Sequence, residues 1–236
     1  MRKHNFYIAM GFFFLSKTEC GRMMTLKKRK EERLMNTIRF EKEDLEAVVE
    51  LLKEGNVVAF PTDTVYGLGV IYENEEALEA LKEAKGRPEN KPIPTMVASL
   101  EQIETIAEVD DRARKLVNAF MPGAFTIILK KKDTLPDYIT NGFDTVGIRM
   151  PDDPFVLEMI EKCEKPLLVT SANLSGEETG VNDEQVLSQL DGRIDAIVLG
   201  EAGGKVASTI VDMSKEEINI IRSGPIDEET ILNTLK

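Results

Sequence analysis

The sequence is poor in the side chains that most often carry out acid–base catalysis or bind metals. Its 236 residues include a single histidine, His4, and two cysteines, Cys20 and Cys163. A lone histidine near the N-terminus leaves the rest of the chain without a Ser-His-Asp triad. The two cysteines form neither a CxxC motif nor a Cys/His cluster, which disfavours a disulfide framework and a structural zinc site. Chemistry in the body of the protein must therefore proceed without imidazole.

Two common nucleotide-binding motifs are also missing from the sequence. It has no GxGxxG stretch, and GEAGGKV (200–206) is not a Walker A motif because a glycine stands too close to the lysine and no Ser or Thr follows. Repeats and low-complexity linkers are absent as well. With 42% hydrophobic and 31% charged residues, the chain fits one globular domain with a substantial core.

Negative charge dominates most of the chain. The formal net charge is −12, but residues 1–40 hold ten Lys and Arg against three Glu, which leaves 20 basic and 39 acidic residues in 41–236, a net charge of −19. A body this acidic repels a phosphate backbone unless basic residues gather locally. We therefore expect direct tRNA binding to be weak or absent.

The first 36 residues differ in pattern from the rest. MRKHNFYIAMGFFFL (1–15) has a basic start and an apolar run that suits a signal-peptide core and is too short to cross a bilayer. No clear small-residue cleavage site follows, and Met23, Met24 and Met35 offer alternative starts. Export and an over-extended start both remain open. We expect residues 1–36 to be an N-terminal extension and residues 37–236 to form the functional domain.

Helix and strand signals alternate from residue 38 onward. The predicted helices cover 43–55, 74–86 and 110–120, with two more starting at the capping residues Ser99 and Asn182. The predicted strands cover 56–60, 125–130, 146–150, 166–170, 196–200, 208–213 and 218–223. Several connections are too short for helical crossovers, so part of the sheet must be antiparallel. The pattern predicts an α/β (α+β) fold with three layers, in which a twisted mixed parallel and antiparallel sheet lies between flanking helices.

Three polar stretches fall at the ends of predicted elements, where α/β proteins tend to place ligand sites. They are PTDTVYGLG (61–69), KGRPENKPIP (85–94) and TSANLSG (170–176). Their shared placement indicates one binding region.

The KGRP stretch offers cations close to a helix end. Lys85 and Arg87 flank Gly86 and precede Pro88, so the two side chains could converge on one anion, and Lys91 adds a third charge. An ordinary solvated basic helix end explains the same residues.

The other two stretches offer hydroxyls, an amide and a carboxylate. Ser171, Asn173 and Ser175 form a neutral donor set that can hold phosphate or carboxylate, although a polar turn after a strand is the alternative. Asp63 could serve as a base, as an indirect metal partner or as a turn residue. Tyr66 could line a pocket or pack in the core.

Six motifs occur in a fixed order along the body of the chain. They are PTDTVYGLG, KGRPENKPI, MPGAFTIIL, GIRMP, TSANLSG and STIVD. This ordered set resembles the Sua5/YciO/YrdC family of L-threonylcarbamoyladenylate synthases, in the short, single-domain form. The resemblance implies a YrdC-like sheet around a large positive cavity. It also implies synthesis of threonylcarbamoyl-AMP from L-threonine, bicarbonate and ATP with release of pyrophosphate, which serves the N6-threonylcarbamoyladenosine (t6A) modification of tRNA.

The same resemblance assigns roles to individual residues. The KxR and SxN elements of the family match Lys85, Arg87, Ser171 and Asn173, which are expected to be catalytic. The residues expected to hold threonine are Thr62, Arg149 and Ser171. The residues expected to contact ATP are Arg87, Lys91, Thr126, Asn173, Ser208 and Arg222. No protein metal site is expected, since Mg²⁺ would be held mainly by the ATP phosphates and water.

Further expectations concern partners and alternatives. The resemblance implies a functional link to a tRNA threonylcarbamoyl-transferase complex, a cytoplasmic location and no stable membrane association.

Met96 stands where many relatives have a histidine, and Ala124 where proline is commoner. A non-enzymatic RNA-binding or nucleotide-binding protein of the same fold is the alternative. We expect Lys85→Ala or Arg87→Ala to abolish turnover and to leave thermal unfolding nearly unchanged.

Overall fold

The computed structural model describes residues 36–88, 91–204 and 206–236. The predicted N-terminal extension, residues 1–36, lies outside this part of the chain apart from Asn36. The described residues form one ten-stranded sheet with helices on its two faces, which confirms the predicted fold class.

The sheet is mixed in direction. Its strands are β1 (Ile38–Phe40), β2 (Val58–Phe60), β3 (Gly67–Ile71), β4 (Thr95–Met96), β5 (Phe125–Lys130), β6 (Thr145–Arg149), β7 (Leu167–Ser171), β8 (Ala196–Val198), β9 (Thr209–Asp212) and β10 (Asn219–Arg222). Their order across the sheet is β1-β8-β2-β3-β7-β4-β6-β5-β9-β10. The pairs β1/β8, β2/β8, β4/β6 and β5/β9 are parallel, and the remaining neighbours are antiparallel.

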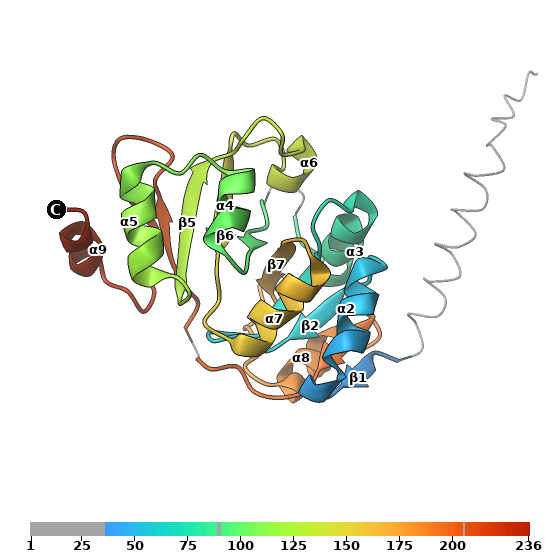
Figure 1. Ribbon diagram of the computed structural model, residues 1–236. Coiled ribbons are helices and arrows are strands. Elements are labelled where there is room, and N and C mark those ends of the chain that lie inside the picture. The colour runs from blue at the N-terminus through green and yellow to red at the C-terminus, as the bar shows by residue number, and fades with distance from the viewer. Residues whose placement is uncertain (1–35, 89–90, 205) are drawn as a thin grey trace, which may run out of the picture.

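The helices belong to two groups. They are α2 (Leu45–Lys53), α3 (Glu75–Lys85), α4 (Leu100–Ile106), α5 (Asp111–Phe120), α6 (Asp137–Thr140), α7 (Pro154–Cys163), α8 (Asp183–Leu190) and α9 (Glu228–Thr234), with a 3-10 turn at Lys42–Asp44. α2 and α7 share one hydrophobic cluster, and the apolar residues of the other helices belong to a second, larger one. Figure 1 shows α9, α5 and β5 in this order from one end of the molecule inward, and β1, α2 and α8 at the other end.

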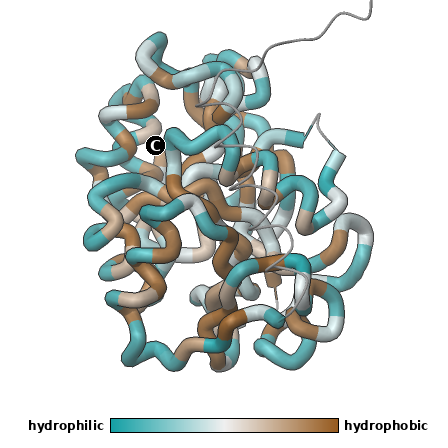
Figure 2. The backbone as a smooth tube through the Cα atoms, turned by 90° about the vertical axis from the view of Figure 1, so that its right-hand side faces the viewer, coloured by the Kyte–Doolittle hydropathy of each residue, from teal (hydrophilic) through white to brown (hydrophobic). Residues whose placement is uncertain are grey.

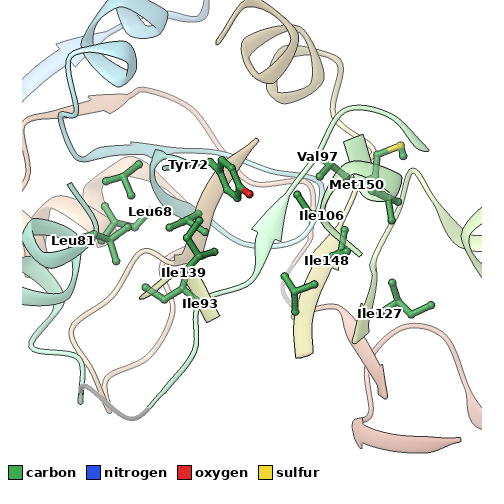
Figure 3. Packing of buried hydrophobic residues seen from close by; sticks show 14 of the residues in the cluster. Leu68, Tyr72, Leu81, Ile93, Val97, Ile106, Ile127, Ile139, Ile148 and Met150 are labelled. Carbon is green, nitrogen blue, oxygen red and sulfur yellow. The ribbon is translucent and has the colours of Figure 1, made fainter. Parts of the chain in front are cut away.

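Alternation along the strands explains why two hydrophobic clusters form. Successive side chains of a strand point to opposite faces of the sheet. Leu167 and Val169 of β7 accordingly belong to the α2/α7 cluster, whereas Leu168 between them belongs to the larger cluster. Figure 2 shows hydrophobic segments running through the interior, and Figure 3 shows Leu68, Ile93 and Ile139 packed in part of the larger cluster. A sheet with both faces buried therefore forms the middle layer.

Helix α3 shows how local sequence signals position the future site. The Asn74 side chain accepts a hydrogen bond from the Ala77 N–H, and Gly86 ends the helix in the left-handed conformation with φ of 60°. Glycine adopts this conformation without the steric cost that other residues meet. The helix therefore ends at a fixed point, with Lys85 in its last turn and Arg87 just beyond it.

Some elements were not predicted from the sequence. α7 follows an Asp153 cap and α9 an Asp227 cap, and both helices lie in stretches for which no element was predicted. β3 occupies GLGVI, part of which was interpreted as a polar loop. Gly69 is needed there for packing, because a Cβ at this position would lie 2.9 Å from the Phe60 ring.

Candidate active site

A cavity of about 290 Å³ opens where the ends of several strands meet. Its lining contains three arginines from different parts of the chain, Arg87, Arg149 and Arg222. The serines and threonines that line it are Thr62, Thr64, Thr95, Thr126, Thr170, Ser171 and Ser208. A concave site with converging guanidinium and hydroxyl groups suits anionic ligands.

Arg149, at the end of β6, contacts the loop that follows β2. Its Nη2 lies 2.5 Å from Asp63 Oδ1, and its Nη1 donates to Thr64 Oγ1 at 2.7 Å. The Arg149 and Asp63 side chains are only 9% and 12% exposed. Burial lowers the pKa of Arg149, and the neighbouring Asp63 carboxylate opposes this effect. The guanidinium is therefore held in one orientation at the cavity wall.

Arg222, at the end of β10, contacts Ser208 just before β9. Its Nε donates to the Ser208 carbonyl at 2.9 Å and its Nη2 to Ser208 Oγ at 3.1 Å. Ser208 Oγ lies 2.7 Å from Thr126 Oγ1 of β5, the strand parallel to β9. Burial, followed by the charge of Arg149, lowers the pKa of Arg222. Arg149 and Arg222 are therefore close enough for their charges to interact.

Arg87 forms another part of the wall. It donates to the carbonyls of Pro92 and Lys91 at 2.8 and 3.2 Å, and to Thr170 Oγ1 of β7 at 3.3 Å. The side chain is half-buried, and burial lowers its pKa. Arg87 thus borders the same cavity as Ser171, the residue that follows Thr170.

Lys85 lies behind the wall, and its side chain is not among the groups that line the cavity. Its Nζ lies 2.5 Å from the Ser171 carbonyl, 2.7 Å from the Asn173 carbonyl and 2.8 Å from Asn173 Oδ1, and the residue is 3% exposed. Burial, with a smaller contribution from the charge of Arg87, lowers the pKa of Lys85 to about 7. The oxygen acceptors favour the ammonium form. Lys85 therefore ties α3 to the loop after β7.

Comparison with known proteins shows the family to which the chain belongs. The sequence model of the Sua5/YciO/YrdC family, described as "Telomere recombination", matches residues 50–224. The chain belongs to this family. It is 42% identical over 184 residues to the Bacillus subtilis threonylcarbamoyl-AMP synthase, covering 77% of this chain and 53% of that protein. It is 33% identical to the Vibrio campbellii threonylcarbamoyl-AMP synthase, covering 77% of this chain and 99% of that protein.

The fold of this chain is also similar to that of a solved structure from the family. The crystal structure of Pyrococcus abyssi Sua5 complexed with L-threonine matches with a TM-score of 0.80 and 36% identity, over 84% of this chain and 60% of that one. The chain thus spans about half the length of the Bacillus and Pyrococcus proteins, 53% and 57%.

The structure brings most of the predicted family residues together. Those that line the cavity are Thr62, Arg87, Thr126, Arg149, Ser171, Ser208 and Arg222. Lys85 and Asn173 lie directly behind Ser171, and Lys91 is exposed outside the lining, with its carbonyl bonded to Arg87. In this arrangement the Lys85 amine points at the loop 171–173, whereas Arg87 borders the cavity.

The structure also shows how Ser175 and Asp63 are placed. The side chain of Ser175 is exposed, and its backbone N–H donates to the Lys85 carbonyl, so Ser175 adds no hydroxyl to the cavity. Asp63 is an ion-pair partner of Arg149 and not a simple turn residue. The position of Asp63 between two threonines gave no sign of this partner, which lies far along the chain on β6.

Tyr66 joins the motif after β2 to the glycine-rich stretch GEAGGKV. Its hydroxyl is buried and lies 2.9 Å from the Val198 carbonyl and 3.0 Å from the Gly200 carbonyl. Gly203 packs so closely on the same motif that a Cβ there would lie 3.0 Å from the Asp63 carbonyl oxygen. Residues 200–204 of this stretch therefore support the loop that carries Thr62, Asp63 and Thr64.

We expect Tyr66→Phe to lower the free energy of unfolding by about 1–2 kcal/mol, because two carbonyl oxygens lose a buried donor. Urea unfolding followed by circular dichroism measures this change. An unchanged midpoint and slope would contradict the bonding role of the hydroxyl.

Two other features bear on the site and its surroundings. Within the described residues, no three His, Cys, Asp or Glu side chains are grouped as metal ligands. In the same part of the chain, none of the helices has the length and apolar character needed to cross a bilayer.

Proposed function

We propose that this chain synthesises threonylcarbamoyl-AMP from L-threonine, bicarbonate and ATP, with release of pyrophosphate. The observation that carries the proposal is the convergence of Arg87, Arg149 and Arg222 on one cavity. The reaction must bring two anions into contact, and guanidinium groups offset their repulsion. The names of the Bacillus and Vibrio relatives, and the L-threonine bound in the Pyrococcus structure, support this choice.

The proposed reaction needs positioning more than acid–base catalysis. The threonine amine captures bicarbonate as a carbamate with loss of water, and a carbamate oxygen then attacks the α-phosphorus of ATP. The bond from that phosphorus to the bridging oxygen breaks, and pyrophosphate leaves. Such a step gains most from alignment and charge neutralisation. A site without histidine is therefore adequate for it.

The residues divide between the two substrates in this proposal. Arg149 and Thr62 hold the threonine carboxylate, with Ser171 nearby. Arg87, Thr126, Ser208 and Arg222 contact the triphosphate, and Lys91 reaches it from outside the lining. Lys85 and Asn173 hold Ser171 in place. Mg²⁺ would be held mainly by the ATP phosphates and water and would neutralise phosphate charge.

The setting of the reaction is also part of the proposal. Residues 37–236 form the catalytic domain, and the product passes to a tRNA threonylcarbamoyl-transferase complex in the cytoplasm. Direct tRNA binding contributes little because residues 41–236 carry a net charge of −19.

Pyrophosphate release from the purified full chain tests the proposal. We expect release only when L-threonine, bicarbonate and ATP are all present, and loss of release when any of them is left out. Salt-sensitive tRNA binding without turnover would overturn the proposal and support the non-enzymatic alternative. Residues 37–236 assayed alone should retain the activity.

A further inference from the structure

The three arginines of the cavity differ in the charge of their partners. Arg87 and Arg222 donate to carbonyl and hydroxyl oxygens, which carry no net charge. Arg149 donates to the Asp63 carboxylate at 2.5 Å. The wall at Arg149 is therefore close to neutral, whereas the walls at Arg87 and Arg222 keep a positive charge.

This difference matters because the two proposed substrates differ in charge. The triphosphate of ATP carries several negative charges, whereas an amino acid carries one carboxylate and one ammonium group. Asp63 and Arg149 are both mostly buried, so solvent screens their field only partly. A carboxylate fixed beside Arg149 repels a polyphosphate more strongly than it repels a zwitterion.

Arg149 can still bind a carboxylate while it is paired with Asp63. Its three hydrogen bonds go to Asp63, Thr64 and the Gly123 carbonyl. A guanidinium has more N–H donors than these bonds use. Thr62 and Thr64, whose hydroxyls lie 3.2 Å apart, line the cavity beside it. This corner therefore offers N–H donors and hydroxyls to a singly charged group.

We infer that Asp63 determines substrate placement, by reserving Arg149 for the carboxylate of the amino acid and keeping polyphosphate out of that corner. The inference rests on the proposed function, because it assumes that both substrates enter this cavity. It assigns no proton transfer to Asp63, which acts through Arg149 as a positioning residue. The charge of Asp63, and not only its hydrogen bond, is what matters.

Asp63→Asn separates charge from geometry, because asparagine keeps an oxygen that accepts from Arg149. Titration calorimetry on the full chain measures the affinity for L-threonine at increasing concentrations of inorganic pyrophosphate. For the unsubstituted chain we expect an affinity for threonine that pyrophosphate leaves unchanged. For Asp63→Asn we expect pyrophosphate to compete with threonine and to weaken its apparent affinity by at least about tenfold.

Further variants guard against a simple structural effect. Asp63→Glu restores the charge and should behave as the unsubstituted chain. Asp63→Ser provides a second neutral variant if Asp63→Asn folds poorly. Asp137→Asn is the matched control, because Asp137 is also ion-paired, with Lys131 at 2.7 Å, but is 81% exposed on α6.

In steady state, the KM for threonine in Asp63→Asn should rise with ATP concentration while kcat stays constant.

The outcomes separate the inference from the proposed function. If the unsubstituted chain binds L-threonine and pyrophosphate does not compete in Asp63→Asn, the inference about Asp63 is wrong and the proposed function stands. Competition that is equal in the unsubstituted chain and in Asp63→Asn would also overturn it. If the unsubstituted chain binds no L-threonine, the proposed function falls and the inference falls with it.

Discussion

Arg87→Ala is expected to slow pyrophosphate release by about a thousandfold, because the variant loses a positive group that offsets the charge developing between carbamate and triphosphate. Its effect on stability should be small. The Arg87 side chain is half-buried, and its Pro92 and Lys91 carbonyl partners belong to exposed residues that water can reach. Single-turnover kinetics and thermal unfolding, measured on the same preparation, check both parts.

The matched control for Arg87→Ala is Arg114→Ala. Arg114 forms an ion pair with Glu104 at 2.6 Å, and both side chains are about two-fifths exposed. Surface pairs of this kind contribute at most about 1 kcal/mol, so this variant should keep full activity. Arg87→Lys should recover only part of the activity, because lysine lacks the planar fork of donors. Unchanged turnover in Arg87→Ala would remove Arg87 from the proposed reaction.

Lys85→Met is expected to damage both stability and activity, which revises the expectation from sequence that thermal unfolding would hardly change. The substitution leaves the carbonyls of Ser171 and Asn173 and the Asn173 side chain without their buried donor. We expect the free energy of unfolding to fall by about 2 kcal/mol and the Tm by about 4–8 °C. Turnover should fall by about a hundredfold or more as Ser171 moves.

Lys115→Met is the control for Lys85→Met, because Lys115 is an exposed helix residue on α5. Lys115→Met should change neither the Tm nor the turnover appreciably. A Lys85→Met variant with the original Tm and low activity would show that Lys85 acts on the substrate directly. If Lys85 instead acts by holding Ser171 and Asn173, stability and turnover fall together.

The region of the candidate site could be predicted from the sequence because its residues lie at element ends with strong local signals. Asn74 and Gly86 fix the two ends of α3, and they place Arg87 just beyond the helix. The apolar run at 166–170 predicts a strand, and β7 begins and ends one residue later, at Leu167 and Ser171. The bonds from Arg87 to Thr170 and from Lys85 to Asn173 hold the end of α3 against the loop after β7.

The direction of individual side chains could not be predicted in the same way. Lys85 and Arg87 are two residues apart, but the helix ends between them, so one amine turns into the protein and one guanidinium turns to the cavity. The pair of Asp63 and Arg149 depends on β6 lying across the sheet from the loop after β2, which no local pattern shows. β3 was missed because its glycines, required by packing against Phe60 and Val169, look like loop residues in the sequence.

Mass spectrometry of the nucleotide product, formed with labelled bicarbonate, can decide whether the chain makes threonylcarbamoyl-AMP. The full chain is incubated with ATP, L-threonine and carbon-13-labelled bicarbonate, and the products are separated. We expect an AMP adduct that contains threonine and carries the labelled carbon, formed in amounts equal to the pyrophosphate released. Conversion of ATP to AMP or ADP without labelled carbon in any nucleotide product would contradict the proposed reaction.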